Sequence, residues 1–130
     1  MLPWLLVAMQ VSLAGPETGA AVTIASPSDG DKVGWQQMIR GTTTLKDAKL
    51  WIVVRPIPAV RFWVQAPATV DANGNWSNVS FFGEKSEAFR GLDFEIMVVA
   101  NPEKELSEGL ELERWPQAEA RSATLKVKRQ

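Results

Sequence analysis

Apolar and polar residues alternate in short runs along most of this chain, and turn-forming residues separate the runs. Successive side chains of a strand point to opposite faces, so an alternation with a period of two predicts β-strands. The pattern predicts seven strands, over 21–25, 35–43, 49–55, 61–65, 76–82, 92–100 and 122–128. Short strands at close spacing, divided by Gly, Pro, Asn and Asp, are typical of an all-β antiparallel sandwich.

The clearest local signal is the turn in the middle of the chain. Asn73-Gly74 lies between two alternating runs, and the positive φ angles of a tight hairpin turn suit both residues. Asp71, Asn73 and Asn75 also alternate as the first ligands of a calcium loop do. The glycine, however, falls at the fourth position where an EF-hand has it at the sixth, and Phe82 replaces the acid at the twelfth. The hairpin is therefore the favoured interpretation.

One segment departs from the strand pattern. Asn101-Pro102-Glu103 has the form of a helix N-cap, a proline at the first helical position and an acid in the first turn. Leu106 follows, and Gly109 is a natural stop. We therefore expect a short helical crossing near 102–109 that leads toward the last strand.

The first residues differ in composition from the rest. Residues 1–14 carry no ionisable side chain, and they are too few to span a bilayer of about 30 Å. They fit the apolar region of a signal peptide, with small residues at Ala14 and Ala20 as cleavage sites, although the basic segment that normally precedes this region is missing. We expect residues 1–20 to be a signal peptide or an N-terminal anchor segment, with a buried N-terminal helix as the alternative. Residues 21–130 then form one extracytoplasmic domain, either periplasmic, secreted or on the cell surface.

Composition narrows the classes of function. The 130 residues are 45% hydrophobic, which suits a single core, and the net charge of -1 gives no bulk attraction to nucleic acid or to an anionic membrane. We expect no nucleic-acid partner, and membrane contact only through residues 1–20 if they are retained. The chain has no His, Cys or Tyr, which removes most side chains that perform acid/base, nucleophilic or metal chemistry. We therefore expect no catalytic residues, no metal and no cofactor.

A weak enzymatic alternative is the pair Asp93 and Glu95. Two residues apart on one strand, their side chains share a face at roughly 6.5 to 7 Å, near the spacing of paired glycosidase carboxylates. Nothing nearby in the sequence raises one pKa, as a general acid requires. The pair is therefore interpreted as two solvent-facing charges.

Three segments together resemble bacterial immunoglobulin-like domains. They are Val22-Thr23-Ile24-Ala25-Ser26-Pro27-Ser28-Asp29-Gly30, Ile39-Arg40-Gly41-Thr42 and Val70-Asp71-Ala72-Asn73-Gly74-Asn75-Trp76-Ser77. The resemblance covers roughly 22–127 and implies an antiparallel immunoglobulin-like sandwich of about seven strands on a secreted or surface protein, with Trp76 as a core anchor. Its motifs are turn chemistry and core positions, which specify a fold and say almost nothing about function.

Candidate binding residues come from the runs 49–55 and 61–65. If the even-numbered residues of both runs fill the core, the odd-numbered residues point outward. The predicted face comprises Trp51, Arg55, Arg61, Trp63 and Gln65. Exposed tryptophan with arginine is the composition of protein hot spots, and flat tryptophan faces also stack on sugar rings. The alternative is that the acidic segment 101–121, which contains Leu106, Leu110, Leu112 and Trp115, folds back and covers this face.

These observations predict a non-catalytic exported interaction module, accessory to a larger surface or periplasmic assembly. Its expected partner is another protein. The alternative is a carbohydrate-binding module that takes a polysaccharide through Trp51 and Trp63.

Overall fold

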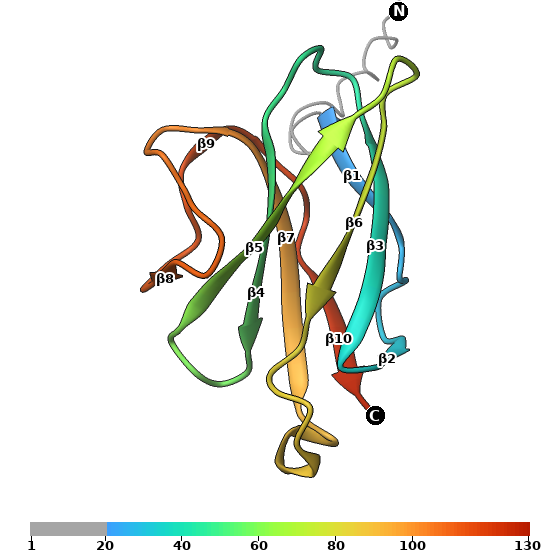
Figure 1. Ribbon diagram of the computed structural model, residues 1–130, viewed down its shortest axis with the longest axis vertical. Helices are drawn as coiled ribbons and strands as arrows, with labels where there is room; N and C mark the ends of the chain where they lie inside the picture. Colours follow the sequence, from blue (N-terminus) through green and yellow to red (C-terminus); the bar gives the residue numbers. More distant parts are fainter. Residues whose placement is uncertain (1–20) are drawn as a thin grey trace, which may run out of the picture.

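The computed structural model describes residues 21–130, which form an all-β fold (Figure 1). Its strands are β1 (Val22–Ser26), β2 (Lys32–Val33), β3 (Gln36–Thr43), β4 (Leu50–Pro56), β5 (Phe62–Val70), β6 (Asn75–Phe81), β7 (Asp93–Pro102), β8 (Glu111–Leu112), β9 (Ala118–Arg121) and β10 (Leu125–Arg129). One turn of 3-10 helix, Glu87–Phe89, lies between β6 and β7. The seven predicted strands correspond to β1, β3, β4, β5, β6, β7 and β10, whereas the short β2, β8 and β9 were not anticipated.

The strands form one curled sheet in the order β1-β3-β6-β5-β4-β7-β10-β2. Pairing is antiparallel throughout this path except between β10 and β2, which run parallel. β8 lies beside β5, and β9 lies beside β7. We call β1, β3 and β6 the β3 half of the sheet, and β4, β7, β10 and β2 the β4 half.

β5 joins the two halves and changes face on the way. Phe62 and Val64 pack on the outer side of the β4 half, whereas Ala68 and Val70 pack into the core between the halves. All four positions are even-numbered, so a regular strand would place them on one face. The register against β4 shifts between Val64 and Pro67, and this β-bulge turns the remainder of β5 over.

The inner core lies between the two halves. Both halves supply its apolar side chains, which include Val22, Ile39 and Trp76 from the β3 half and Leu50, Ile52, Val54, Phe94, Ile96, Val98 and Val127 from the β4 half. Trp76 is 3% exposed, so its predicted place in the core is confirmed. Its ring lies on the backbone of Gly41, the residue opposite it in the ladder between β3 and β6.

The predicted hairpin is confirmed, and Asp71 organises its turn. One carboxylate oxygen, Oδ1, accepts the backbone N–H groups of Asn73 at 2.8 Å and Asn75 at 2.9 Å. Gly74 has a φ of 83°, in the left-handed region that favours glycine. The two backbone hydrogen bonds favour the charged carboxylate, so they hold the pKa of Asp71 below its ordinary value of 3.8.

The helix expected over 102–109 is wrong, because β7 continues to Pro102 and pairs there with β9. Asn101 has a φ of 52°, whereas an N-cap residue is extended, and its side chain accepts the backbone N–H of Lys49 at 3.0 Å. Leu106 is buried against the outer side of the sheet. The path of this segment therefore follows the burial of its apolar side chains rather than its local capping signals.

Gly41→Ala should lower the free energy of unfolding by about 3 kcal/mol, because overpacking a core is costly. A Cβ at position 41 would lie 1.9 Å from the carbonyl oxygen of Thr23 and 2.3 Å from the Trp76 ring. Urea unfolding followed by tryptophan emission measures the effect. Gly34→Ala is the matched control, since the nearest atom to its Cβ lies at an ordinary 3.4 Å. Equal losses in the two variants would contradict the close approach.

Asp71→Asn should be less stable than the wild type at pH 7 and as stable as the wild type at pH 2. The folded pKa of Asp71 lies below its unfolded value, so its charge stabilises the fold above about pH 3.9 and that stabilisation is lost as the pH falls through the folded pKa. Thermal midpoints at both pH values test this. The control is Asp47→Asn, at an exposed position with a φ of 55° that asparagine also adopts. A deficit for Asp71→Asn that is as large at pH 2 would argue against the charge effect.

Candidate functional site

The part of the predicted Trp and Arg face that holds Trp51 is covered. Trp51 is 6% exposed and belongs to an outer cluster on the β4 half with Val53, Phe62, Val64, Met97, Val99 and Leu106. Residues 103–117, which we call the crossing segment, supply the cover through Leu106, Leu112 and Trp115. The rings of Trp115 and Phe62 meet edge to face with their centroids 4.7 Å apart. The alternative in which the acidic segment folds back is therefore confirmed for the part of the face around Trp51, whereas Leu110 and Trp63 are 37% and 38% exposed.

Trp51 and Trp63 do not share a face, contrary to the prediction. Val53 is opposite Val64 and Val54 is opposite Trp63 in the ladder between β4 and β5. Val53 and Val64 lie in the outer cluster and Val54 lies in the inner core, so Trp63 is on the inner side. The period of two tells which residues of one strand share a face. The pairing with the neighbouring strand decides whether the odd-numbered or the even-numbered residues of β5 face the inner core.

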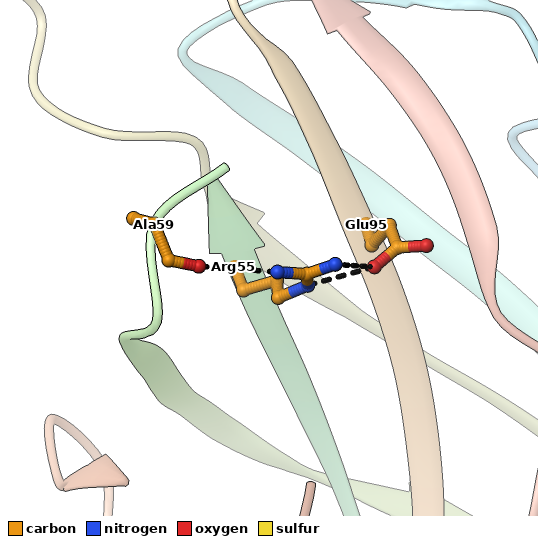
Figure 2. A network of polar contacts seen from close by, with 3 residues as sticks. All are labelled: Arg55, Ala59 and Glu95. Carbon is orange, nitrogen blue, oxygen red and sulfur yellow. Dashed lines mark hydrogen bonds and ion pairs between the residues drawn. The ribbon is translucent and has the colours of Figure 1, made fainter. Parts of the chain in front are cut away.

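Both predicted arginines hold carboxylates. Arg55 bonds Oε1 of Glu95 through Nε and Nη2, each at 2.7 Å, and donates from Nη1 to the carbonyl oxygen of Ala59 at 3.1 Å (Figure 2). Its guanidinium also lies 5.4 Å from the centroid of the Phe62 ring. Arg61 forms an ion pair with Glu111 of β8. These contacts fasten the end of β4 and the crossing segment, which is a structural task.

The carboxylates Asp93 and Glu95 are each held by a different cation. Glu95 is paired with Arg55, and Asp93 lies 2.9 Å from Nζ of Lys128. Each carboxylate is thus engaged in an ion pair within the fold. The geometry therefore favours the interpretation of this pair as structural charges.

A groove of about 450 Å³ opens between β5 and the connection that follows β6. This volume is within the range of ligand sites, and such sites are mostly apolar with a few polar groups. The groove is lined by Val54, Pro56, Trp63, Val64, Gln65, Phe81, Gly83, Glu84, Phe89, Phe94, Glu108 and Gly109.

The groove exists because β5 and β6 meet at their hairpin and then diverge (Figure 1). Beyond the divergence the crossing segment takes the free edge of β5: the N–H of Val64 donates to the carbonyl of Leu110 at 2.9 Å, and the N–H of Gly109 donates to the carbonyl of Val64 at 2.8 Å. On the other side the N–H of Phe81 donates to Oε1 of Gln65 at 2.9 Å. These backbone groups are thus satisfied without closing the gap between the strands.

Aromatic rings and inner-core side chains line the groove. Val54 and Phe94 belong to the inner core and also line the groove. Trp63 and Phe81 are each 38% exposed, which is unusual for side chains of this size. Phe89 packs on Gly83, where a Cβ would lie 2.2 Å from its ring. The core therefore continues into an open, aromatic surface.

Three polar side chains border this apolar surface. Gln65 is 8% exposed, and its Nε2 has a single long hydrogen bond of 3.4 Å, to the carbonyl of Trp63. Glu84 and Glu108 are exposed, and neither forms an ion pair with any residue of 21–130. The groove thus offers an amide donor and two carboxylates beside the rings.

Of the predicted site residues, the structure brings only Trp63 and Gln65 to this groove. Trp51, Arg55 and Arg61 lie elsewhere, and the sequence analysis missed Phe81, Phe89, Glu84 and Glu108. One signal was available for Phe81. It precedes Phe82 at the end of a strand, and since neighbours point to opposite faces, one of the two rings had to leave the core.

No group of three or more His, Cys, Asp or Glu side chains suited to a metal ion is found within residues 21–130. In the same part of the chain, no helix is long and apolar enough to cross a membrane. Comparison with known protein families, with curated proteins and with solved structures finds no significant match to this chain.

Leu106→Ala should lower the free energy of unfolding by about 3 kcal/mol, because Leu106 is 6% exposed within the outer cluster. Leu110→Ala is the matched control in the same crossing segment; Leu110 is 37% exposed, so its loss should stay below about 1 kcal/mol. Urea unfolding measures both. A small loss for Leu106→Ala would mean that the crossing segment is not firmly packed on the sheet.

Proposed function

We propose that this protein is a non-catalytic binding module that receives a segment of a partner protein in the groove between β5 and the connection after β6. The observation that carries the proposal is the pair of half-exposed rings, Trp63 and Phe81, at an opening that leads to inner-core side chains. Exposed large apolar groups gathered at a groove mark interaction sites, and Trp is prominent among the residues that dominate protein interfaces.

The proposal includes the fold and location expected from the sequence. In the proposed immunoglobulin-like sandwich, the β3 half and the β4 half are the two layers. The inner core between these halves supports this arrangement. The apolar, uncharged residues 1–14 support an extracytoplasmic location, in which the module would serve a surface or periplasmic assembly.

The carbohydrate alternative loses its original argument. It required Trp51 and Trp63 to be exposed on one face, but Trp51 is covered and the two residues lie on opposite sides of the sheet. We therefore propose a protein partner, and treat a polysaccharide as an outcome of the test.

We expect the full chain to select peptides that depend on the groove. Phage-displayed random 12-residue peptides are panned on the wild-type protein and counter-selected on Trp63→Ala. Synthetic versions of the enriched peptides are then titrated while tryptophan emission is followed. Binding should be saturable, and Trp63→Ala or Phe81→Ala should weaken it at least tenfold, since side chains of this kind anchor protein interfaces.

Val60→Ala is the matched control, because Val60 is 72% exposed and lies outside the groove. It should bind the peptides like the wild type, and unfolding midpoints establish that each variant is folded. If no enriched peptide distinguishes the wild type from both ring variants, the proposal is wrong. A soluble polysaccharide that binds through Trp63 where no peptide does would replace the protein partner with a carbohydrate.

A further inference from the structure

We infer that the partner segment that enters the groove carries an apolar side chain next to a lysine or an arginine. This inference rests on the proposed function, because it specifies the ligand chemistry of the same groove. Its basis is the combination of three features of the groove: inner-core apolar side chains in its lining, two glutamates outside the ion pairs of the fold, and the side-chain amide of Gln65.

The apolar part of the segment follows from the inner surface of the groove. Val54 and Phe94 are 2% and 1% exposed, and they reach the groove between the flanking rings of Trp63 and Phe89. A Leu, Ile, Met or Phe side chain of the partner would cover these atoms. Burial of such a side chain is the main source of affinity at a site of this composition.

The cationic part follows from the charges that the fold leaves unpaired. Three ion pairs occur within residues 21–130, and they occupy Glu95, Glu111 and Asp93. None of them includes Glu84 or Glu108, although both residues line the groove. The groove lining contains no Lys or Arg. Both charged residues of the lining are therefore acidic, which favours a cationic group on the ligand.

Three cations near the groove contact other groups of the fold. Arg55 and Arg61 are paired with carboxylates, and Nζ of Lys85 lies 5.8 Å from the centroid of the Trp35 ring, which in turn contacts Phe81. Trp63 remains as an exposed aromatic face beside the two glutamates. Aromatic faces attract lysine and arginine, so the ring and the carboxylates favour the same kind of ligand group.

Gln65 offers a hydrogen bond that suits a polypeptide backbone. Its Oε1 is engaged by the N–H of Phe81, while Nε2 makes only the 3.4 Å hydrogen bond to the carbonyl of Trp63. One N–H of this carboxamide is thus left to donate, at a side chain that is 8% exposed and lines the groove. A backbone carbonyl of an inserted segment would accept this hydrogen bond.

A peptide array tests the inference. Each spot carries a 9-residue peptide in which two adjacent central positions sample all pairs of amino acids and the flanking positions are mixtures. The full-length wild-type protein should bind apolar-Lys and apolar-Arg pairs about five- to tenfold more strongly than the corresponding apolar-Glu pairs, as expected for two partly exposed charge contacts. The preference should shrink in 0.5 M NaCl, because salt screens exposed charges.

The decisive variant is the double substitution Glu84→Gln and Glu108→Gln. It should abolish the preference for basic pairs and retain the binding of apolar pairs. The matched control is Glu103→Gln with Glu105→Gln, which makes the same change in net charge at exposed positions of the crossing segment outside the groove lining. This control should keep the preference of the wild type.

The other outcomes separate this inference from the proposed function. Apolar peptides that bind through Trp63 regardless of charge would overturn the inference and leave the proposed function standing. An equal loss of preference in both double variants would also overturn it, by assigning the effect to overall negative charge. Displacement of bound peptide by butylammonium at similar affinity would replace the peptide with a small organic cation. Absence of any Trp63-dependent peptide binding would overturn the proposed function itself.

Discussion

The β-bulge in β5 is the constraint on which the rest of this structure depends. Before the bulge, Phe62 and Val64 face the outer side of the β4 half; after it, Ala68 and Val70 face the inner core. β5 thereby belongs to both halves of the curled sheet. Its first residues pair with β8, and its last residues pair with β6. Because β-bulges increase twist and bend a strand, β5 leaves β6 soon after the hairpin. The groove is the space that this departure leaves.

The β4 half is buried on both of its faces, and this requires the crossing segment. Even-numbered residues of β4, such as Ile52, fill the inner core, while Trp51 and Val53 fill the outer cluster. Strands covered on two sides read as continuous apolar runs, as β4 does. Leu106, Leu112 and Trp115 supply the outer cover, and the ion pair between Arg61 and Glu111 ties it to β5. The crossing segment is thus amphipathic. Its apolar side chains pack on the sheet, and its acidic side chains face solvent.

The groove combines backbone groups that are hydrogen-bonded within the chain with side chains that are open to solvent, which suits it to a ligand better than to another strand. Hydrogen bonds from the crossing segment and from Gln65 occupy backbone groups at the edges where β5 and β6 separate. Added strands need free N–H and C=O groups, and at Val64 and Phe81 these bonds occupy them. What remains open are the rings of Trp63 and Phe81 and the two carboxylates. In the proposed function, recognition would therefore depend on side chains of the partner, with one backbone contact from Gln65.

Local patterns determined the elements of the fold, and tertiary pairing determined the site. Alternation and the Asn73-Gly74 turn located seven strands and the hairpin, and Trp76 was correctly expected in the core. These features are encoded within a few residues, because strand period and turn angles are local properties. The helix expected after Asn101 and the shared face of Trp51 and Trp63 were both wrong. Burial of Leu106 overrode the capping signal, and the register that pairs Trp63 with Val54 placed Trp63 on the inner side of the sheet. Which side of a strand is buried depends on the register of its neighbours, so only the assembled sheet could bring Trp63, Gln65 and Phe81 to one groove.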